Sequence, residues 1–564
     1  MFFRYLLIFA VIGSLALARA QTENPPPAPS PTGIPGLSEV PGLKMAHSGS
    51  WGPLVEDYTM NTTSAGPSPA DLLNRGFYQL QLFRSPQAAR HFLAALREDP
   101  HCAMAWVGLY FALLERGDEV KTQREQCYQQ AIQRRDKVTP HEQTWIEAMS
   151  ELHLKGVREF AIVLDNIRRD YPGDLHATLW LPLMLRDGYD AGGQARPGQR
   201  AAEALLRQQL QLRPDDPVVL HAWCQLGLAS PKAEDFVGQA RLLLELQPPS
   251  PYFRQAAGLI LFRRGEISLA VEAFESARSM EEQSLKHEGI APIAAPTYFD
   301  NLDCLAMALT EAGRIKDALA LAEQAMQIEL PWSAPAAPAV REFGFFTLTA
   351  ATRIHARSGN WDAAAKALPK NAHALVAASH PVALWLDFLR NYCAGQIAIA
   401  KNKQDDAKKA LNTVESLQAA MNTQTAVLRK EGFDPQWTEV VRLADFLQYE
   451  LRAAVKYTQN DQPSASHWWR TASERQLPGL ARGVPRWSRP AVESMAQAYL
   501  DKNDALLGVA AWEEAVRERL QSGWALRGLL AARTMAGDKT GAANAAKALE
   551  AVWPFADEDL KKPQ

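Results

Sequence analysis

The sequence is poor in several features that would indicate a particular chemistry. Its 564 residues contain five cysteines, and none of them forms a Cys-x-x-Cys pair. An odd number of separated cysteines argues against a disulfide framework, so we expect them to be small buried core residues, with one disulfide left open. Lysine and arginine number 60 against 63 aspartates and glutamates, for a net charge of -3. This balance argues against a nucleic-acid partner, which requires a basic surface.

Motifs of catalysis and metal binding are also missing. The chain has no His-Glu-x-x-His, Gly-x-x-x-x-Gly-Lys or Gly-x-Ser-x-Gly segment, and its 12 histidines are scattered. Acidic pairs such as Asp405-Asp406 precede lysines, which is typical of a solvated helix face. We therefore expect a non-enzymatic protein without a cofactor or a metal site.

The first twenty residues have the pattern of an export signal. Arg4 is followed by a mostly apolar run over 6–17 and by Ala18-Arg19-Ala20, an A-x-A-type cleavage site. We expect cleavage before Gln21 and export to the periplasm or cell envelope. Retention of the signal would instead make the protein a membrane-tethered structural protein. No later segment has eighteen uninterrupted apolar residues, so the mature chain is not expected to insert into a membrane.

Residues 21–68 differ in composition from the rest of the chain. Prolines recur between positions 25 and 41, with glycine, serine and threonine between them. Such a segment can form neither a regular helix nor a core, so residues 21–68 are predicted to be a disordered, proline-rich leader.

A spaced pattern of small and large residues begins after the leader. Gly76 is followed by Ala88, Phe92, Ala95 and Pro100, at offsets of 12, 16, 19 and 24 residues. The small residues allow two antiparallel helices to approach closely, Phe92 and Ala95 fill one face of the second helix, and Pro100 ends that helix. This is the tetratricopeptide repeat (TPR) pattern of about 34 residues per helix–turn–helix unit.

Further copies of the repeat follow along the chain. The spacing recurs at Gly258, Ala270, Phe274 and Ala277, and weaker copies include those that begin at Gly395, Ala453 and Ala496. No segment alternates with the period of a strand. The fold class predicted is therefore all-α, a right-handed α-solenoid of TPR-like repeats. A proline-rich joint at 331–338 divides it into an N-terminal array over 69–330 and a C-terminal array over 339–560.

Several segments resemble a family of exported bacterial TPR proteins of obscure function. They cover 89–106, 139–149, 485–494 and 523–529. The resemblance implies protein interaction in the cell envelope. Relatives tend to carry histidines near the central repeats, where this chain has Pro251-Tyr252-Phe253-Arg254 and Asn301-Leu302-Asp303. This difference argues against the alternative of a metal-dependent or hydrolase-like enzyme within the repeats.

The resemblance also implies which side chains face a concave groove. In TPR proteins these lie at positions 2, 5, 9 and 12 of each first helix. A groove with such side chains would suit an extended peptide or a helix with apolar anchors. The alternative is that these side chains pack against neighbouring repeats. The predicted binding residues are Tyr252, Gln255, Leu259, Phe262, Asp303, Met307, Tyr392 and Gln396.

Overall fold

The computed structural model describes residues 55–561, apart from 191, 249, 331–337, 370–379, 432–434, 481–482, 488 and 520. The predicted signal peptide and most of the predicted leader and joint lie outside the described residues. The chain divides into two compact units. Unit 1 comprises 1–256, 276–298 and 334–340, and unit 2 comprises 257–275, 299–333 and 341–564. These units differ from the predicted arrays 69–330 and 339–560, because the central helices contribute residues to both units.

The described residues form helices and no β-strand, apart from one isolated bridge between Tyr189 and Ala195. The predicted all-α repeat fold is confirmed. The elements up to residue 250, all in unit 1, are η3 (Glu56–Tyr58), α2 (Pro67–Gln81), α3 (Ser85–Glu98), α4 (Ala103–Ala112), η4 (Leu114–Val120), α5 (Lys121–Ile132), η5 (Arg135–Lys137), α6 (Pro140–Leu154), α7 (Val157–Asp170), α8 (Leu175–Leu185), α9 (Pro197–Leu212), α10 (Pro217–Gly227) and α11 (Glu234–Glu245).

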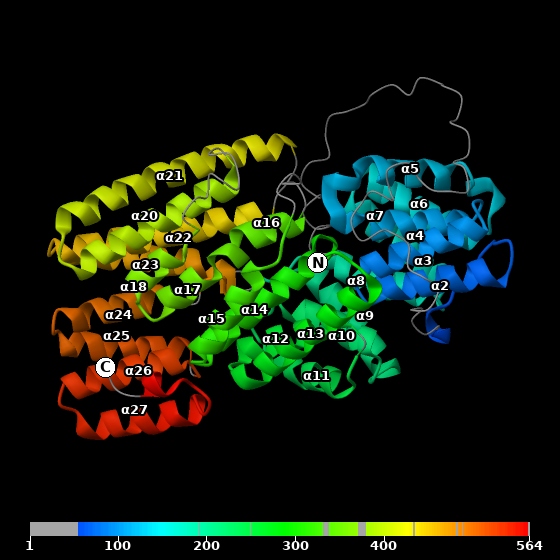
Figure 1. Cartoon of the computed structure of the whole chain (residues 1–564). Coiled ribbons are helices and arrows are strands. Elements are labelled where there is room, and N and C mark those ends of the chain that lie inside the picture. The colour runs from blue at the N-terminus through cyan, green and yellow to red at the C-terminus, as the bar shows by residue number, and fades with distance from the viewer. Residues whose placement is uncertain are drawn as a thin grey trace. The chain divides into compact units, whose positions relative to one another are not determined.

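The remaining elements run from the boundary region through unit 2 (Figure 1). They are α12 (Pro251–Arg264), α13 (Ile267–Glu288), η6 (Pro292–Ala294), α14 (Pro296–Glu311), α15 (Ile315–Met326), α16 (Pro338–Phe345), η7 (Thr347–Thr349), α17 (Ala350–Arg357), α18 (Trp361–Ala367), α20 (Pro381–Ala400), α21 (Gln404–Glu431), α22 (Pro435–Thr458), α23 (Gln462–Leu480), α24 (Ala491–Asp501), α25 (Ala505–Glu518), α26 (Gly523–Met535), α27 (Lys539–Val552) and α28 (Glu558–Lys561).

Successive helices pair into hairpins within each unit. In unit 1, α2 packs on α3 and α6 on α7; in unit 2, α20 packs on α21, α22 on α23, α24 on α25 and α26 on α27. The first helices of neighbouring hairpins also contact one another, as α20 does α22, α22 does α24 and α24 does α26. The repeated hairpin therefore generates a continuous layer of first helices in this part of unit 2.

The glycines of the repeat pattern lie where two helices come closest. A Cβ atom placed on Gly76 would lie 2.6 Å from Phe92 Cε1, and one on Gly258 would lie 2.7 Å from Phe274 Cε1. Both phenylalanines are fully buried. The close approach of the helices predicted from the spacing is confirmed, and the structure adds its form: a large ring on the second helix occupies the space that the glycine leaves free on the first.

The start of α6 carries a capping box. Thr139 accepts a hydrogen bond from the backbone N–H of Glu142, whose carboxylate in turn accepts one from the backbone N–H of Thr139. This reciprocal capping box satisfies two of the backbone donors at the start of the helix, and Pro140 at the first helical position has no donor to satisfy.

The predicted disordered leader is wrong at its C-terminal end. Residues 55–66 are described and attach to the helices of unit 1. The Tyr58 hydroxyl donates to Asp216 Oδ2 at 2.7 Å, and the Thr63 hydroxyl donates to Glu142 Oε2 at 2.7 Å. Tyr58 is buried. Composition could not indicate this, because these contacts are made with residues far along the chain.

The burial of the cysteines agrees with the expectation from the sequence. All five cysteines, Cys102, Cys127, Cys224, Cys304 and Cys393, are buried and none is in a disulfide, as expected of small core residues. Among the described helices, none combines the length and apolar character that crossing a bilayer requires.

Candidate functional site

Most of the predicted binding residues lie in the interior of the protein. Leu259, Phe262, Met307 and Gln255 are buried, which agrees with the packing alternative that the sequence left open. Tyr252 donates a hydrogen bond to Glu281 at 3.1 Å and borders a cavity of about 10 Å³, the size of one water molecule. Ligand binding by these side chains stays a prediction.

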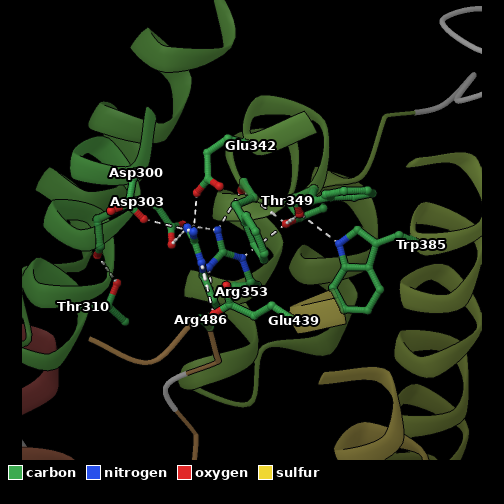
Figure 2. Close-up of polar contacts among 12 residues, drawn as sticks. Asp300, Asp303, Thr310, Glu342, Thr349, Arg353, Trp385, Glu439 and Arg486 are labelled. Carbon is green, nitrogen blue, oxygen red and sulfur yellow. Dashed lines mark hydrogen bonds and ion pairs between the residues drawn. The ribbon is translucent and has the colours of Figure 1, made fainter. Parts of the chain in front are cut away.

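Asp303 belongs to a buried ion-pair network in unit 2, which Figure 2 shows in detail. It contacts Arg486 at 2.6 Å and also pairs with Arg353, while Arg486 pairs further with Asp300 at 3.0 Å and with Glu342. Burial alone would raise the pKa of Asp303, but Arg353 and Arg486 hold it below its ordinary value. The role that these contacts support for Asp303 is to join α14, α17 and the segment before α24.

A second buried group of ion pairs in unit 2 borders an open space. Arg357, at the end of α17, pairs with Glu311 at 2.7 Å and with both oxygens of Glu493 on α24. Its guanidinium also lies over the ring of Trp524, 4.9 Å from the centroid. Burial alone would lower the pKa of Arg357, but Glu311 and Glu493 raise it, so the residue is held as a cation.

The open space is a cavity of about 330 Å³ in unit 2. We call it the α20–α26 cavity, because the first helices α20, α22, α24 and α26 contribute to its walls, together with α17, α18, α23 and α25. Of the predicted binding residues, Gln396 lines it, next to Ile399 on the same face of α20. The polar and aromatic side chains that line the cavity include Gln396, Glu450, Arg489, Glu493, Ser494, Trp469, Trp512, Trp524 and Arg527.

Tyr392 forms hydrogen bonds with two side chains of the cavity wall, Glu450 and Gln396. It is fully buried and donates a hydrogen bond to Glu450, and it accepts one from Gln396 Nε2 at 3.0 Å. Glu450 also accepts a hydrogen bond from Ser494. Burial raises the pKa of Glu450, against the opposing effects of Arg489 and its two hydrogen-bond donors. Both oxygens of Glu450 are thus already engaged by the protein.

The carboxylates and guanidiniums that line the cavity differ in their partners. Glu493 is paired with Arg357, and Asp501 at the exposed edge accepts a hydrogen bond from Gln497 at 2.9 Å. Arg527 has no hydrogen-bond or ion-pair partner among the described residues, and burial lowers its pKa. Arg527 is therefore a half-buried cation that forms no ion pair with a carboxylate of the described residues.

Arg489 is held in place by a hydrogen bond and a ring contact, and its positive charge acts on Glu450, whose pKa it lowers against the effect of burial. Its Nε donates to Ser494 Oγ at 2.9 Å, and its guanidinium lies 5.3 Å from the centroid of the Trp361 ring. Within the described ranges it makes no ion pair with a carboxylate.

Reasoning from the sequence missed most of this cavity, although the repeat spacing contained a signal for part of it. Tyr392 and Gln396 lie three residues before and one residue after Gly395. The same offsets from Ala453 give Glu450 and Ala454, and those from Ala496 give Glu493 and Gln497, all of which line the cavity. Arg527 lies directly before the small residue Gly528, so these offsets do not find it.

No arrangement of three or more histidine, cysteine, aspartate or glutamate side chains suited to a metal ion occurs in the described part of the chain. Asp300, Asp303 and Glu342 do converge, but on the guanidinium of Arg486 (Figure 2). The position that a cation would take is occupied by the protein itself.

No family model matches the chain, and no curated protein matches it. Solved structures similar to it include Naa15/Naa10 bound to HypK-THB, at 14% identity and a TM-score of 0.25, covering 75% of this chain and 65% of that one. A human IFIT1 dimer with PPP-AAAA has 12% identity and a TM-score of 0.33, covering 87% and 95%. The APC/C hetero-tetramer Cut9–Hcn1 has 11% identity and a TM-score of 0.27, covering 87% and 88%. At these values the similarity identifies neither a family nor a function.

Proposed function

We propose that this chain is a non-enzymatic binding scaffold, and that the α20–α26 cavity receives a segment of a partner protein. The observation that carries the proposal is the difference between anions and cations in the cavity wall. Glu450 and Glu493 are both engaged by neighbouring protein groups, whereas Arg527 is not. Acid–base catalysis would need carboxylates free to exchange protons with a substrate. Among the lining carboxylates, Glu450 and Glu493 are engaged, which leaves Asp501 at the exposed edge.

The size and composition of the cavity support a peptide ligand. A volume of about 330 Å³ is at the lower end of the range for ligand pockets, which suits one or two side chains. Trp469, Trp512 and Trp524 give the wall aromatic surface, which is typical of the anchoring centre of a protein interface.

Selection from a library of short random peptides tests this function. The wild-type chain should retain a set of peptides, and Ala400→Trp should weaken their binding about tenfold or more, because Ala400 lies at the exposed edge of the cavity and a tryptophan would fill it. Ala420→Trp, an exposed alanine of α21 outside the cavity, is the matched control. Failure of the wild type to retain any peptide better than Ala400→Trp would refute the proposal.

We further propose that the scaffold acts in the periplasm or cell envelope. This rests on Arg4, the apolar run and Ala18-Arg19-Ala20, all outside the described residues. N-terminal sequencing of the protein from its native host should give Gln21 as the first residue. A chain that keeps residues 1–20 would support the tethered alternative instead.

A further inference from the structure

We infer that unit 1 carries a binding site for an extended segment, that residues 55–66 occupy it as a built-in ligand, and that the same segment of a second copy of this chain can take their place. We call residues 55–66 the strap. The inference concerns unit 1 alone and does not depend on the function proposed for the α20–α26 cavity of unit 2.

One end of the strap binds at the starts of two helices through Tyr58. The Tyr58 hydroxyl donates to Asp216 Oδ2 at 2.7 Å, just before α10. The Tyr58 carbonyl accepts a hydrogen bond from His176 Nε2 at 3.0 Å, in the first turn of α8. The Tyr58 ring also packs against Tyr78 and His176, with centroid distances of 5.3 and 5.9 Å. Tyr58 is therefore held by its side chain and its backbone together.

The other end of the strap binds at two further helix starts. The backbone N–H of Thr63 donates to Glu142 Oε1 in the first turn of α6, and the backbone N–H of Ala65 donates to Asp99 Oδ2 in the turn before α4, both at 2.8 Å. The helices α4, α6, α8 and α10 are the first helices of consecutive hairpins. The strap thus crosses the starts of four first helices of unit 1.

Two carboxylates under the strap divide their oxygens between unit 1 and the strap. Oδ1 of Asp216 accepts a hydrogen bond from the backbone N–H of Val218 in α10, and Oδ1 of Asp99 accepts one from the backbone N–H of His101. Oδ2 of each aspartate accepts from the strap instead. Such a row of acceptors is complementary to an extended segment, because its backbone N–H groups and hydroxyls recur along the chain.

The strap has the burial pattern of an extended segment that lies on a surface. Tyr58 and Met60 are buried, whereas Thr59 and Asn61 are exposed. Successive side chains of an extended chain point to opposite sides, so one side of the strap faces unit 1. The backbone N–H and C=O of Met60 are both paired with the side chain of Asn74 in α2, at 2.8 and 3.3 Å. The site therefore recognises the backbone as well as two buried side chains.

A second copy of this chain is the occupant whose fit the structure demonstrates, because it carries the same strap. The strap is joined directly to α2, with no residue between Gly66 and Pro67. Met60 lies beside Asn74, so the chain reverses its direction over this short connection. Exchange requires a change of the backbone only near Gly66 and leaves the helices of both copies intact. Elements on short connections are prone to exchange, since the same contacts form in either arrangement.

A labelled synthetic peptide of residues 55–66, which stands in for the strap of a second copy, tests the site. In the full chain, Tyr58→Phe with Thr63→Val keeps the shape of both side chains and removes their hydroxyl contacts with Asp216 and Glu142. The chain's own strap then competes less well. This variant should therefore bind the peptide about tenfold or more tightly than the wild type does, the effect of a lost hydrogen bond to a charged group. A peptide with the same two substitutions should bind the variant about tenfold or more weakly than the natural peptide.

Thr59→Val is the matched control within the strap. The Thr59 hydroxyl donates to the carbonyl of Glu56 in the strap itself, so this variant should bind the peptide as the wild type does. Melting temperatures establish that each variant folds, and Tyr58→Phe alone is the milder variant if the double substitution does not.

Sedimentation of the full wild-type chain over a range of concentrations tests the exchange between copies. A dimer should form as the concentration rises, and excess peptide should convert it to monomer. Insertion of Gly-Ser-Gly-Ser between Gly66 and Pro67 should weaken the dimer, because a longer connection lets the strap fold back on its own chain. The same insertion before Val55 is the control. A folded variant that binds no peptide, a wild type that stays monomeric, or a dimer that the peptide does not dissociate would each overturn the inference.

Discussion

The carboxylate of Asp303 lies 2.6 Å from the guanidinium of Arg486, and both side chains are almost fully buried in unit 2 (Figure 2). The two residues are 183 positions apart. Arg486 also lies 3.6 Å from the centroid of the Phe346 ring, so its charge is surrounded by protein on several sides. Such a group depends on its carboxylates, because water cannot solvate it.

Asp303→Ala should therefore destabilise unit 2 strongly. Removal of one partner leaves Arg353 and Arg486 buried with too little negative charge, at a cost of about 3–5 kcal/mol. Denaturant unfolding of the variant measures the loss. Asp317→Ala, which removes an exposed ion pair with Arg314, is the control and should cost about 1 kcal/mol or less. Equal costs for the two variants would show that the buried network contributes no more than a surface pair.

Phe274→Ala should also be costly, for a different reason. The ring fills the space beside Gly258, and its removal leaves a cavity between α12 and α13, at a cost of about 3–5 kcal/mol. Hydrogen exchange should locate the loss mainly in the neighbouring hairpins, since repeats couple chiefly to their neighbours. Leu506→Ala, at a side chain that is 82% exposed, is the comparison and should leave the unfolding midpoint unchanged. An unchanged melting temperature for Phe274→Ala would contradict the packing described.

The stability of unit 1 should fall as the pH rises, because of Glu281. Burial raises the pKa of this carboxyl from 4.5 to about 8, although Tyr252, Arg84 and Thr297 favour its ionised form; Glu115 adds to the rise. The folded state thus holds a proton that the unfolded state releases. This contribution to stability is complete below the unfolded pKa of 4.5 and is lost as the pH rises through 8.

Melting temperatures measured from pH 5 to pH 9 test this dependence. Glu281→Gln keeps the shape of the side chain without the proton, so its melting temperature should fall less between those limits than that of the wild type. Parallel curves for the two proteins would mean that Glu281 is not the group responsible.

The capping box of α6 provides a smaller, local test. Thr139→Ala removes the side-chain acceptor for the backbone N–H of Glu142 and should cost about 1 kcal/mol. Thr139→Ser keeps the hydroxyl and should restore most of the stability in chemical unfolding. If serine were no better than alanine, packing of the threonine methyl group would be the cause.

Local and repeated features of this fold could be predicted, and long-range ones could not. The contacts of Gly76 with Phe92 and Gly258 with Phe274 follow from a spacing that recurs within each hairpin. The pairing of Asp303 with Arg486 depends on how separate hairpins stack, which no short segment encodes. In the candidate site, too, some residues follow from the repeat spacing and others depend on how the hairpins stack. The repeat offsets identify Gln396, while Arg527 enters the cavity through the placement of α26 beside α24.

The strap formed by residues 55–66 limits where the chain can be shortened. Met60 and Ala65 each donate a backbone hydrogen bond of 2.8 Å, to Asn74 and Asp99 respectively, and both acceptors are buried. Removal of all residues before Pro67 would leave these two buried acceptors without the backbone donors of Met60 and Ala65. A cut just before Val55 would keep both hydrogen bonds. Recombinant versions intended for biophysical work should accordingly start no later than that valine.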